Sequence, residues 1–439
     1  MSDPKKASVA YVRQTILPEQ APPGTAIGMI GWIRANLFSG WFNTVLTLLS
    51  ILAIYGLLSV ILPWLFSPTW GAQSLDECRE IIAATFAEGT SKACWGVIRD
   101  RWIQLLFGFY PSEMYWRPIL AFILLGVALA PILFSERTPR KFLVVTALYP
   151  FVMPWLLWGG SIWVPVAVMA GFALAYAVLK YTGPRMGTLS STLLAVAVAL
   201  IWWLFLAMPV AGLVQSAIPL GLTPVVSRDF GGMMLSIIIG VVAIGFSLPI
   251  GIVLALGRKS DLLIVKALCV GFIEFIRGVP LITLLFVASV LLNIFLPPGT
   301  DFDIILRVII MATVFASAYV AEVIRGGLAA LPAGQYEAAD ALGLDYWRAQ
   351  RLVIMPQALK ISIPGIVSTF IGLFKDTTLV SIIGLLDPLG LSNAIRADSD
   401  WNGIVWELYS FIALMFFVFC FSMSRYSMYL ERKLQTETR

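Results

Sequence analysis

Ten long apolar runs constrain the fold of this 439-residue chain more than any other feature of its sequence. An α-helix needs about 20 mostly apolar residues to cross the roughly 30 Å of hydrocarbon in a bilayer, and each run is close to that length. We therefore predict an all-α integral membrane protein with about ten transmembrane helices. The expected spans are about 42–66, 118–134, 142–158, 162–179, 191–213, 233–256, 280–297, 304–324, 362–386 and 405–424.

The composition agrees with this class. Hydrophobic residues make up 59% of the chain, against about 45–50% in soluble domains. Charged residues make up 13%, about half of the usual fraction of roughly 25%. These values exclude a disordered chain, a nucleic-acid-binding domain and an ordinary soluble enzyme. The net charge of +5 is typical of a membrane protein with basic cytoplasmic loops.

Positive charges fall on one side of the predicted membrane if both termini are cytoplasmic. The basic residues that set this orientation are Lys5, Lys6, Arg13, Arg34, Arg137, Arg140, Lys141, Lys180, Arg185, Arg258, Lys259, Lys266, Arg348, Arg351, Lys360, Arg425, Arg432, Lys433 and Arg439. The short loops on the opposite side are acidic, with Asp301, Asp303, Asp387, Asp398 and Asp400 against Arg396 alone. Because short cytoplasmic loops carry excess Lys and Arg, we predict cytoplasmic termini.

The longest predicted external loop covers about 67–117 and contains Cys78 and Cys94. An external compartment permits a disulfide, which we expect between these two residues. The alternative is two unpaired thiols. Cys269 and Cys420 lie in apolar runs, where cysteine usually serves as a packing residue.

The composition changes near residue 230, since twelve of the fifteen tryptophans precede it. We interpret residues 1–230 as an accessory region of five spans that includes the external loop. Residues 231–439 then form a second region of five spans that carries the function. The alternative is a single undivided domain.

Several kinds of catalytic site are excluded by missing residues. The chain has no histidine, so it has no Ser-His-Asp triad and no HExxH zinc site. A P-loop requires Gly-Lys followed by Ser or Thr, and this chain has no Gly-Lys pair. It therefore has no route to ATP hydrolysis by a P-loop of its own.

A polar segment at about 332–360 follows the eighth span. Pro332 and Gly334 are expected to end the outgoing helix. Residues 335–342 then predict a short helix that Gly343 ends, because glycine readily takes the left-handed conformation found after helices. Residues 345–355 predict a second helix with Asp345 as its N-cap.

This helix–turn–helix is expected to protrude into the cytoplasm. The alternative is an amphipathic hairpin that lies on the lipid surface. The small residues Ala338, Ala339, Ala341 and Gly343 suit close packing against a protein better than anchoring in lipid.

In this segment the sequence resembles a known family. The pattern Glu337-Ala338-Ala339, then Gly343, then Ile354-Met355-Pro356 is similar to the EAA motif of binding-protein-dependent ABC importer permeases. Met355 stands where that family usually has Leu. The glycine falls six residues after the glutamate and the proline nineteen residues after it, as in the motif.

Three further segments narrow the resemblance to permeases for polar amino acids. They are Phe272–Pro280 with Val279 in place of the usual Thr, Arg325-Gly326-Gly327, and Phe374-Lys375-Asp376-Thr377-Thr378-Leu379. This similarity covers about 230–435. The five extra spans and the cysteine-bearing loop resemble the long permease subunit of general L-amino acid importers (the AapM/BztC type).

The resemblance implies a five-helix type I importer core with five accessory helices, in the bacterial inner membrane. Residues 335–358 would form coupling helices that dock in a groove of a separate ATPase subunit, with Glu337, Ala338, Ala339, Gly343 and Pro356 as the motif residues. Two ATPase subunits would use ATP and Mg, and this chain would bind no cofactor itself. A second permease subunit, expected to be a shorter homologue, and a periplasmic binding protein that delivers L-amino acids would complete the importer. No nucleic acid is expected as a partner.

Lys375 and Asp376 lie inside an apolar run, where ionisable groups are costly and usually face a cavity or a charged partner. They can line the translocation path, with Lys375 near a substrate carboxylate and Asp376 near its ammonium. They can equally be structural, bonded to neighbouring helix ends. Thr377 and Thr378 suit either alternative, because small hydroxyl side chains also allow close helix packing.

Two acid–base pairs stand near the predicted cytoplasmic ends of their spans: Glu274 with Arg277, and Glu322 with Arg325. A spacing of three residues allows an ion pair on one helix. The pairs can fix the positions of the helices in the interface, or they can form a gate that breaks between inward and outward states.

A stand-alone secondary transporter or channel is the main alternative function. It would also have ten spans and intramembrane charges, but inverted repeats and broken helices in both halves are expected for many such proteins. No clear repeat is visible. A membrane enzyme is disfavoured because no nucleophile or metal cluster is recognisable.

Overall fold

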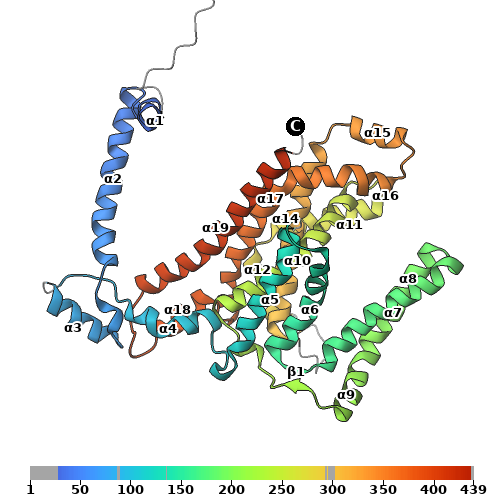
Figure 1. The fold of residues 1–439 in the computed structure, drawn as a ribbon, viewed down its shortest axis with the longest axis horizontal. Helices are drawn as coiled ribbons and strands as arrows, with labels where there is room; N and C mark the ends of the chain where they lie inside the picture. The colour runs from blue at the N-terminus through green and yellow to red at the C-terminus, as the bar shows by residue number, and fades with distance from the viewer. Residues whose placement is uncertain (1–27, 87–88, 135, 292–293, 295–301, 437–439) are drawn as a thin grey trace, which may run out of the picture. The chain divides into compact units, whose positions relative to one another are not determined.

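A computed structural model describes residues 28–86, 89–134, 136–291, 294 and 302–436 (Figure 1). The predictions that concern Lys5, Lys6, Arg13, Asp301 and Arg439, and the end of the span expected at 280–297, lie outside these residues. Contacts divide the chain into two units, which are described separately. The smaller comprises Met1–Pro68 with Ile82–Ala93, and the larger comprises Thr69–Ile81 with Cys94–Arg439.

The smaller unit is built around α2 (Trp41–Leu65), preceded by the short α1 (Gly28–Asn36). None of the 25 residues of α2 is buried. Lys92 donates a hydrogen bond of 2.6 Å to the carbonyl of Pro63, at the end of the helix. A helix that is apolar on all sides and has no buried residue within its own chain is suited to contact lipid or another membrane protein.

The larger unit contains the other described helices and one small sheet. In its accessory part the elements are η1 (Thr69–Gly71), α3 (Leu75–Thr85, whose end belongs to the smaller unit), α4 (Gly96–Phe107), η2 (Ser112–Met114), α5 (Trp116–Leu133), η3 (Arg140–Phe142), α6 (Leu143–Trp158), β1 (Gly160–Ser161), α7 (Trp163–Met186), α8 (Thr188–Ile201), the π-helix η4 (Trp202–Leu206), α9 (Ala207–Ala217), β2 (Gly221–Leu222) and η5 (Ser227–Asp229).

The following elements are α10 (Gly232–Arg258), α11 (Leu263–Gly278), α12 (Leu281–Phe286), the π-helix η6 (Val287–Leu291), α14 (Ile304–Ala329), α15 (Gly334–Ala341), α16 (Tyr346–Ala349), the π-helix η7 (Gln350–Ile354), α17 (Met355–Asp376), the 3-10 helix η8 (Thr377–Ile383), α18 (Pro388–Arg396) and α19 (Trp406–Thr436). The two strands pair antiparallel, with Gly160 opposite Leu222, at the base of the α7–α9 hairpin.

Nine helices of the described residues are long and apolar enough to cross a membrane, and they correspond to nine of the ten predicted spans. The seventh span, expected at 280–297, has a different structure. Here α11 and the segment Leu281–Ser289 meet at an angle of 100°. Pro280 explains the break, because proline has no N–H to continue the helix and forces an extended backbone on the residue before it.

One hydrophobic core joins the accessory helices to the following helices. Ala121 of α5 and Leu157 of α6 are buried in the same cluster as Leu235 of α10 and Val308 of α14. This shared core shows that α5 and α6 pack on the second half of the chain as parts of one cluster. The division into regions at residue 230 stays a prediction.

Close glycine contacts fix α4 against the start of α10. The backbones of Gly108 and Gly231 cross so closely that a Cβ on Gly108 would overlap the Gly231 backbone. Gly108 also has a positive φ of 71°, which side-chain-bearing residues rarely adopt. The chain therefore needs glycine at this crossing.

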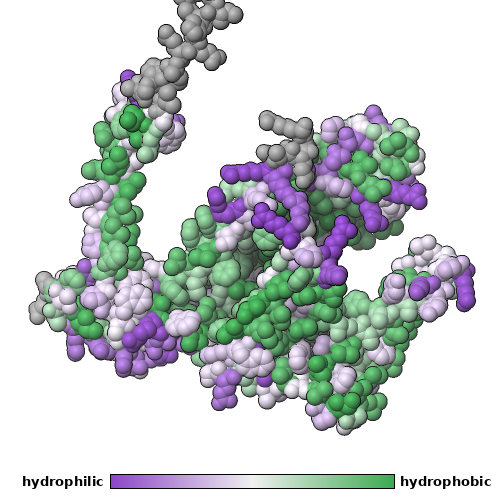
Figure 2. All heavy atoms as spheres, viewed as in Figure 1, coloured by the Kyte–Doolittle hydropathy of each residue, from purple (hydrophilic) through white to green (hydrophobic). Residues whose placement is uncertain are grey.

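A second hydrophobic cluster lies at the opposite end of α10. It contains Ala255 of α10, Ile273 of α11, Ile324 and Leu328 of α14, and Ile354 of η7. Figure 2 shows hydrophobic side chains along much of the helical surface and hydrophilic ones gathered at its ends, among them the α15–α16 end, where both kinds are mixed. The polar segment between α14 and α17 therefore projects from an apolar helical body.

Candidate functional site

The loop between α14 and α17 has the helix–turn–helix arrangement that its sequence predicts. α15 is followed by Gly343 at φ +69°, and Asp345 then caps α16 by accepting a hydrogen bond of 2.9 Å from the Arg348 N–H. The Leu344 N–H donates to the Ala339 carbonyl at 3.1 Å and closes the turn. Gly343 and Asp345 thus fix the direction in which α16 leaves α15.

The predicted range 345–355 implies a second helix that is separate from the following membrane helix. In the structure the two are continuous. α16 continues through η7 directly into α17, and the stretch Tyr346–Ile383 is long and apolar enough to be one span. Pro356 stands in the first turn of α17, directly after the π-helix η7. A displacement of α16 is therefore carried along a continuous helical path.

The motif residues divide into an inner and an outer face. Ala339 is 1% exposed, so its small side chain serves packing within this chain. Glu337, Ala338 and Pro356 are exposed and remain available to a partner. Of the two alanines expected to allow close approach to another subunit, only Ala338 has the exposure for that role.

Large apolar side chains on this polar loop are exposed. They are Leu342 at 76%, Tyr346 at 52%, Trp347 at 70% and Leu352 at 64% exposure. The Tyr346 and Trp347 rings meet edge to face, with centroids 5.3 Å apart. A concentration of exposed apolar groups beside acidic and basic residues is typical of a surface that binds another protein or lies on a membrane.

Glu322 of α14 is the centre of an ion-pair network. Its carboxylate accepts a hydrogen bond of 2.8 Å from Nε of Arg325, three residues along the same helix. It also lies 3.1 Å from Nη1 of Arg258 on α10 and 3.8 Å from Nη1 of Arg277 on α11. Glu322 thus connects three helices.

The second predicted pair is arranged differently. Glu274 lies 2.9 Å from Arg258 of α10, while Arg277 of its own helix is directed toward Glu322. Arg258 therefore contacts both carboxylates. Sequence reasoning missed this role, because its partners lie 16 and 64 residues away and leave no local spacing signal.

The structure places Lys375 and Asp376 at the end of α17, without bringing them into contact with an opposite charge on another helix. Lys375 is exposed and Asp376 is partly buried, and among the described residues neither forms an ion pair within 4.0 Å. The Thr377 and Thr378 hydroxyls donate to the carbonyls of Phe374 and Lys375. These threonines thus shape the transition from α17 to η8.

The depth of Lys375 follows from its neighbour Phe374, whose ring packs on Gly240 of α10. A Cβ on Gly240 would lie 2.8 Å from that ring. Gly240 is eight residues, or about 12 Å, from the start of α10 at Gly232. Lys375 therefore lies near the level of Gly240, closer to the start of α10, which sequence analysis predicts to be external, than to its other end.

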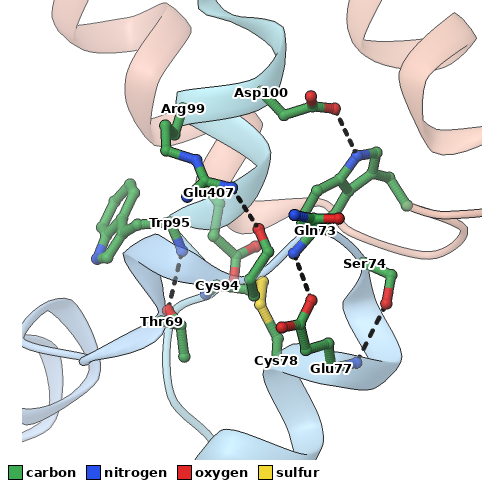
Figure 3. Close-up of a disulfide and its surroundings, with 12 residues drawn as sticks. Thr69, Gln73, Ser74, Glu77, Cys78, Cys94, Trp95, Arg99, Asp100 and Glu407 are labelled. Carbon is green, nitrogen blue, oxygen red and sulfur yellow. Dashed lines mark hydrogen bonds between the residues drawn. A yellow bond between two sulfur atoms is a disulfide. The ribbon is translucent and has the colours of Figure 1, made fainter.

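The disulfide expected between Cys78 and Cys94 is present (Figure 3), with Cα atoms 5.9 Å apart. It belongs to a bonded region that connects the accessory loop with the C-terminal helices. The Cys94 N–H donates to Glu407 at 2.9 Å, Arg101 pairs with Asp398 at 2.8 Å, and the indole of Trp401 donates to Asp100 at 3.1 Å. The disulfide thus fixes the part of the loop that contacts α19.

Asp387 is a buried carboxyl group that sequence reasoning treated only as a loop charge. It caps α18 by accepting hydrogen bonds from the N–H groups of Leu389 and Gly390 at 3.1 and 2.9 Å. Burial raises the pKa of Asp387 from 3.8 to about 6, and these backbone hydrogen bonds only partly oppose the shift. In the described part of the chain, no group of three or more Cys, Asp or Glu residues can hold a metal ion.

Comparison with known proteins finds a matching family and relatives that match nearly the full length of the chain. Residues 247–436 match the family described as "Binding-protein-dependent transport system inner membrane component". Over 434 residues the chain is 58% identical to the glutamate/glutamine/aspartate/asparagine transport system permease protein BztC of Rhodobacter capsulatus, covering 99% of this chain and 100% of that protein. It is 39% identical over 423 residues to the inner membrane amino-acid ABC transporter permease protein YhdY of Escherichia coli, covering 95% and 96%.

A shorter relative matches less than half of the chain. The probable glutamine ABC transporter permease protein GlnP of Bacillus subtilis is 31% identical over 195 residues, which are 44% of this chain and 87% of that protein. The matched residues thus make up most of that protein but less than half of this chain.

Proposed function

This chain belongs to the inner-membrane permeases of amino-acid ABC transporters, and we propose that it works as the long subunit of a heterodimeric importer for acidic amino acids and their amides. It is a transmembrane permease subunit of an amino-acid ABC importer. The proposal concerns its partners, its orientation and its substrates.

The observation that carries the proposal is the α15–α16 loop. It presents exposed apolar side chains to a partner, while Ala339 and Ile354 anchor it in the chain's own core. A separate ATPase subunit with bound ATP and Mg fits this surface, since the permease sequence has no P-loop of its own. ATP-driven closure of two such subunits would move α16 and, through η7, α17.

The proposed orientation places both termini and the α15–α16 loop in the cytoplasm. The disulfide supports it, because the Cys78–Cys94 bond belongs in an oxidising external compartment. In this orientation the surface around α4 and α18 faces the periplasm, where a binding protein would deliver the amino acid.

The proposed partner in the membrane is a shorter permease of the same family. The relative GlnP supports this proposal, because 195 matched residues already make up 87% of that permease. Two such cores would enclose one pathway between them, and the accessory helices of this chain would remain outside that pathway.

The substrate class is proposed from two observations. BztC, 58% identical over its full length, is a permease for glutamate, glutamine, aspartate and asparagine. Lys375 provides an exposed cation within an apolar run of the sequence, and Asp376 beside it provides a carboxyl group. Lys375 would meet a substrate carboxylate and Asp376 its ammonium group, with the ion-pair network of Glu322 and Glu274 as the inner gate.

Uptake by proteoliposomes that contain the complete importer tests this function. We expect uptake of labelled glutamate, glutamine, aspartate and asparagine that requires the binding protein and ATP inside the vesicles. Uptake that continues without ATP would instead indicate a secondary transporter.

A variant of Lys375 distinguishes a role in the translocation path from a structural role. Lys375→Gln is expected to raise the KM for glutamate by about tenfold, the effect of losing roughly 1.4 kcal/mol of binding, with a smaller change for glutamine. The matched control is Lys180→Gln, at an exposed lysine near the end of α7. Equal changes for both substrates, or none, would remove Lys375 from the path.

A further inference from the structure

We propose that Arg258 and Lys259, at the end of α10, are positioning residues that transmit movement of the α15–α16 loop to the ion-pair network. The inference rests on the proposed function, because it assumes that an ATPase subunit moves this loop. Neither residue belongs to the EAA motif of the loop. Arg258 contacts the ion-pair network, and Lys259 contacts α15 of the loop.

Arg258 is the connection to the network. Its Nη1 lies 2.9 Å from Glu274 of α11 and 3.1 Å from Glu322 of α14. The arginine is 22% exposed and Glu322 is 21% exposed, so solvent screens this pair less than it screens a surface ion pair. One guanidinium group therefore ties α10 to both helices.

Lys259 is the connection to the loop. Its Nζ donates to the hydroxyl of Tyr336 on α15 at 3.4 Å and lies 5.5 Å from the centroid of that ring. The hydrogen bond is long and exposed, so it contributes little stability by itself. The position of this hydrogen bond is what matters, because it joins α15 to Lys259, the residue next to Arg258.

Hydrophobic packing supports the same route. Ala255, one turn before Lys259, is fully buried in the cluster that contains Ile354 of η7 and Leu328 of α14, and Tyr336 packs against this cluster. Close-packed side chains do not deform continuously, so a shift of α15 must be met by a shift of the end of α10. That shift changes the distances from Arg258 to both carboxylates.

The network can tolerate loss of Arg258 without leaving a buried carboxylate unpaired. Glu322 retains Arg325 at 2.8 Å and Arg277 at 3.8 Å, and Glu274 is 53% exposed and can be hydrated. Arg258→Gln therefore removes the connection between helices while the fold and the remaining ion pairs persist.

The test measures amino acid transported per ATP hydrolysed by the complete importer in proteoliposomes. We expect Arg258→Gln to keep the ATPase activity within twofold of wild type and to lower the transported amount per ATP by about fivefold or more, the lower range of measured allosteric couplings. The control is Arg185→Gln, an exposed arginine near the end of α7 that makes no contact with the network.

A double-variant cycle adds a readout that a purely structural role would not move. Tyr336→Phe keeps the ring but removes the acceptor for Lys259. If the two contacts lie on one route, the double variant transports no worse per ATP than Arg258→Gln alone. Multiplying effects would show two independent contributions and overturn the proposal.

The remaining outcomes are equally distinct. An unchanged ratio in Arg258→Gln overturns the inference while the importer function stands. A parallel loss of ATPase activity, transport and thermal stability would show that Arg258 only maintains the fold, and would also overturn it. A wild-type importer without ATP-dependent uptake would instead contradict the proposed function.

Discussion

Replacing Gly343 by alanine isolates the contribution of backbone conformation to ATPase binding. Gly343 adopts φ +69°, and no atom lies within 4 Å of the position that a Cβ would take. The substitution therefore creates no clash and removes no contact. Its only direct effect in the folded state is the strain of a left-handed conformation, which costs a side-chain-bearing residue roughly 1–2 kcal/mol.

This strain sets the expected loss of affinity. The loop can relieve it by leaving the left-handed conformation, but α16 then points away from its observed direction. Binding of the ATPase subunit would have to restore that direction. A cost of roughly 1–2 kcal/mol corresponds to an affinity about 5- to 30-fold weaker.

The assay measures binding of purified ATPase subunit to the permease complex in lipid nanodiscs. Gly334→Ala is the matched control, because Gly334 lies in the same loop, has a negative φ and also has open space at its Cβ position. Gly343→Asn should fall between glycine and alanine, since asparagine tolerates the left-handed region. An affinity for Gly343→Ala within twofold of wild type, or an equal loss in Gly334→Ala, would refute the reasoning.

Two further predictions concern the region around α18 and α19. Exchanging Cys78 and Cys94 for serine should lower the free energy of unfolding by about 3 kcal/mol, the value for a loop of about 15 residues, and thermal denaturation should show no such loss in Cys269→Ser. Asp387 has a pKa of about 6 in the folded state and 3.8 in the unfolded state. Its contribution to the free energy of unfolding is therefore fully present below pH 3.8 and is lost as the pH rises through 6. Asp387→Asn, which keeps a capping oxygen, should therefore gain stability relative to wild type between pH 4 and pH 7 by an amount of order 3 kcal/mol, and a difference independent of pH would contradict this.

Local signals explain why most spans and the turn could be predicted. A transmembrane helix is defined by continuous hydrophobicity, and Gly343 and Asp345 act on their own immediate backbone. Pro280 is also a local signal, but the apolar residues that follow it lead to the prediction of a straight span at 280–297. The structure instead has a sharp bend at this proline. Here the backbone rule overrides the composition.

The ion-pair network could not be predicted, because its geometry depends on how three helices pack. Spacing along the chain favoured Glu274 with Arg277, while packing places Arg258 between Glu274 and Glu322. A spacing of three permits an ion pair but does not select it over a partner on a neighbouring helix. Only the crossing of α10, α11 and α14 decides the pairing.

The accessory part of the chain restrains α19 near both of its ends. Near its start, Glu407 accepts from the Cys94 backbone, and near its end, the Tyr426 hydroxyl donates to the Leu133 carbonyl at 2.7 Å. Lys433 adds an ion pair of 2.6 Å with Glu136.

Displacing α19 as a rigid helix would break contacts at both ends together. α10, α14 and α17 share the buried cluster with η7, so the proposed movement of the loop would reach them directly. In the proposed importer, α19 would thus be a restrained neighbour of the helices that the loop displaces.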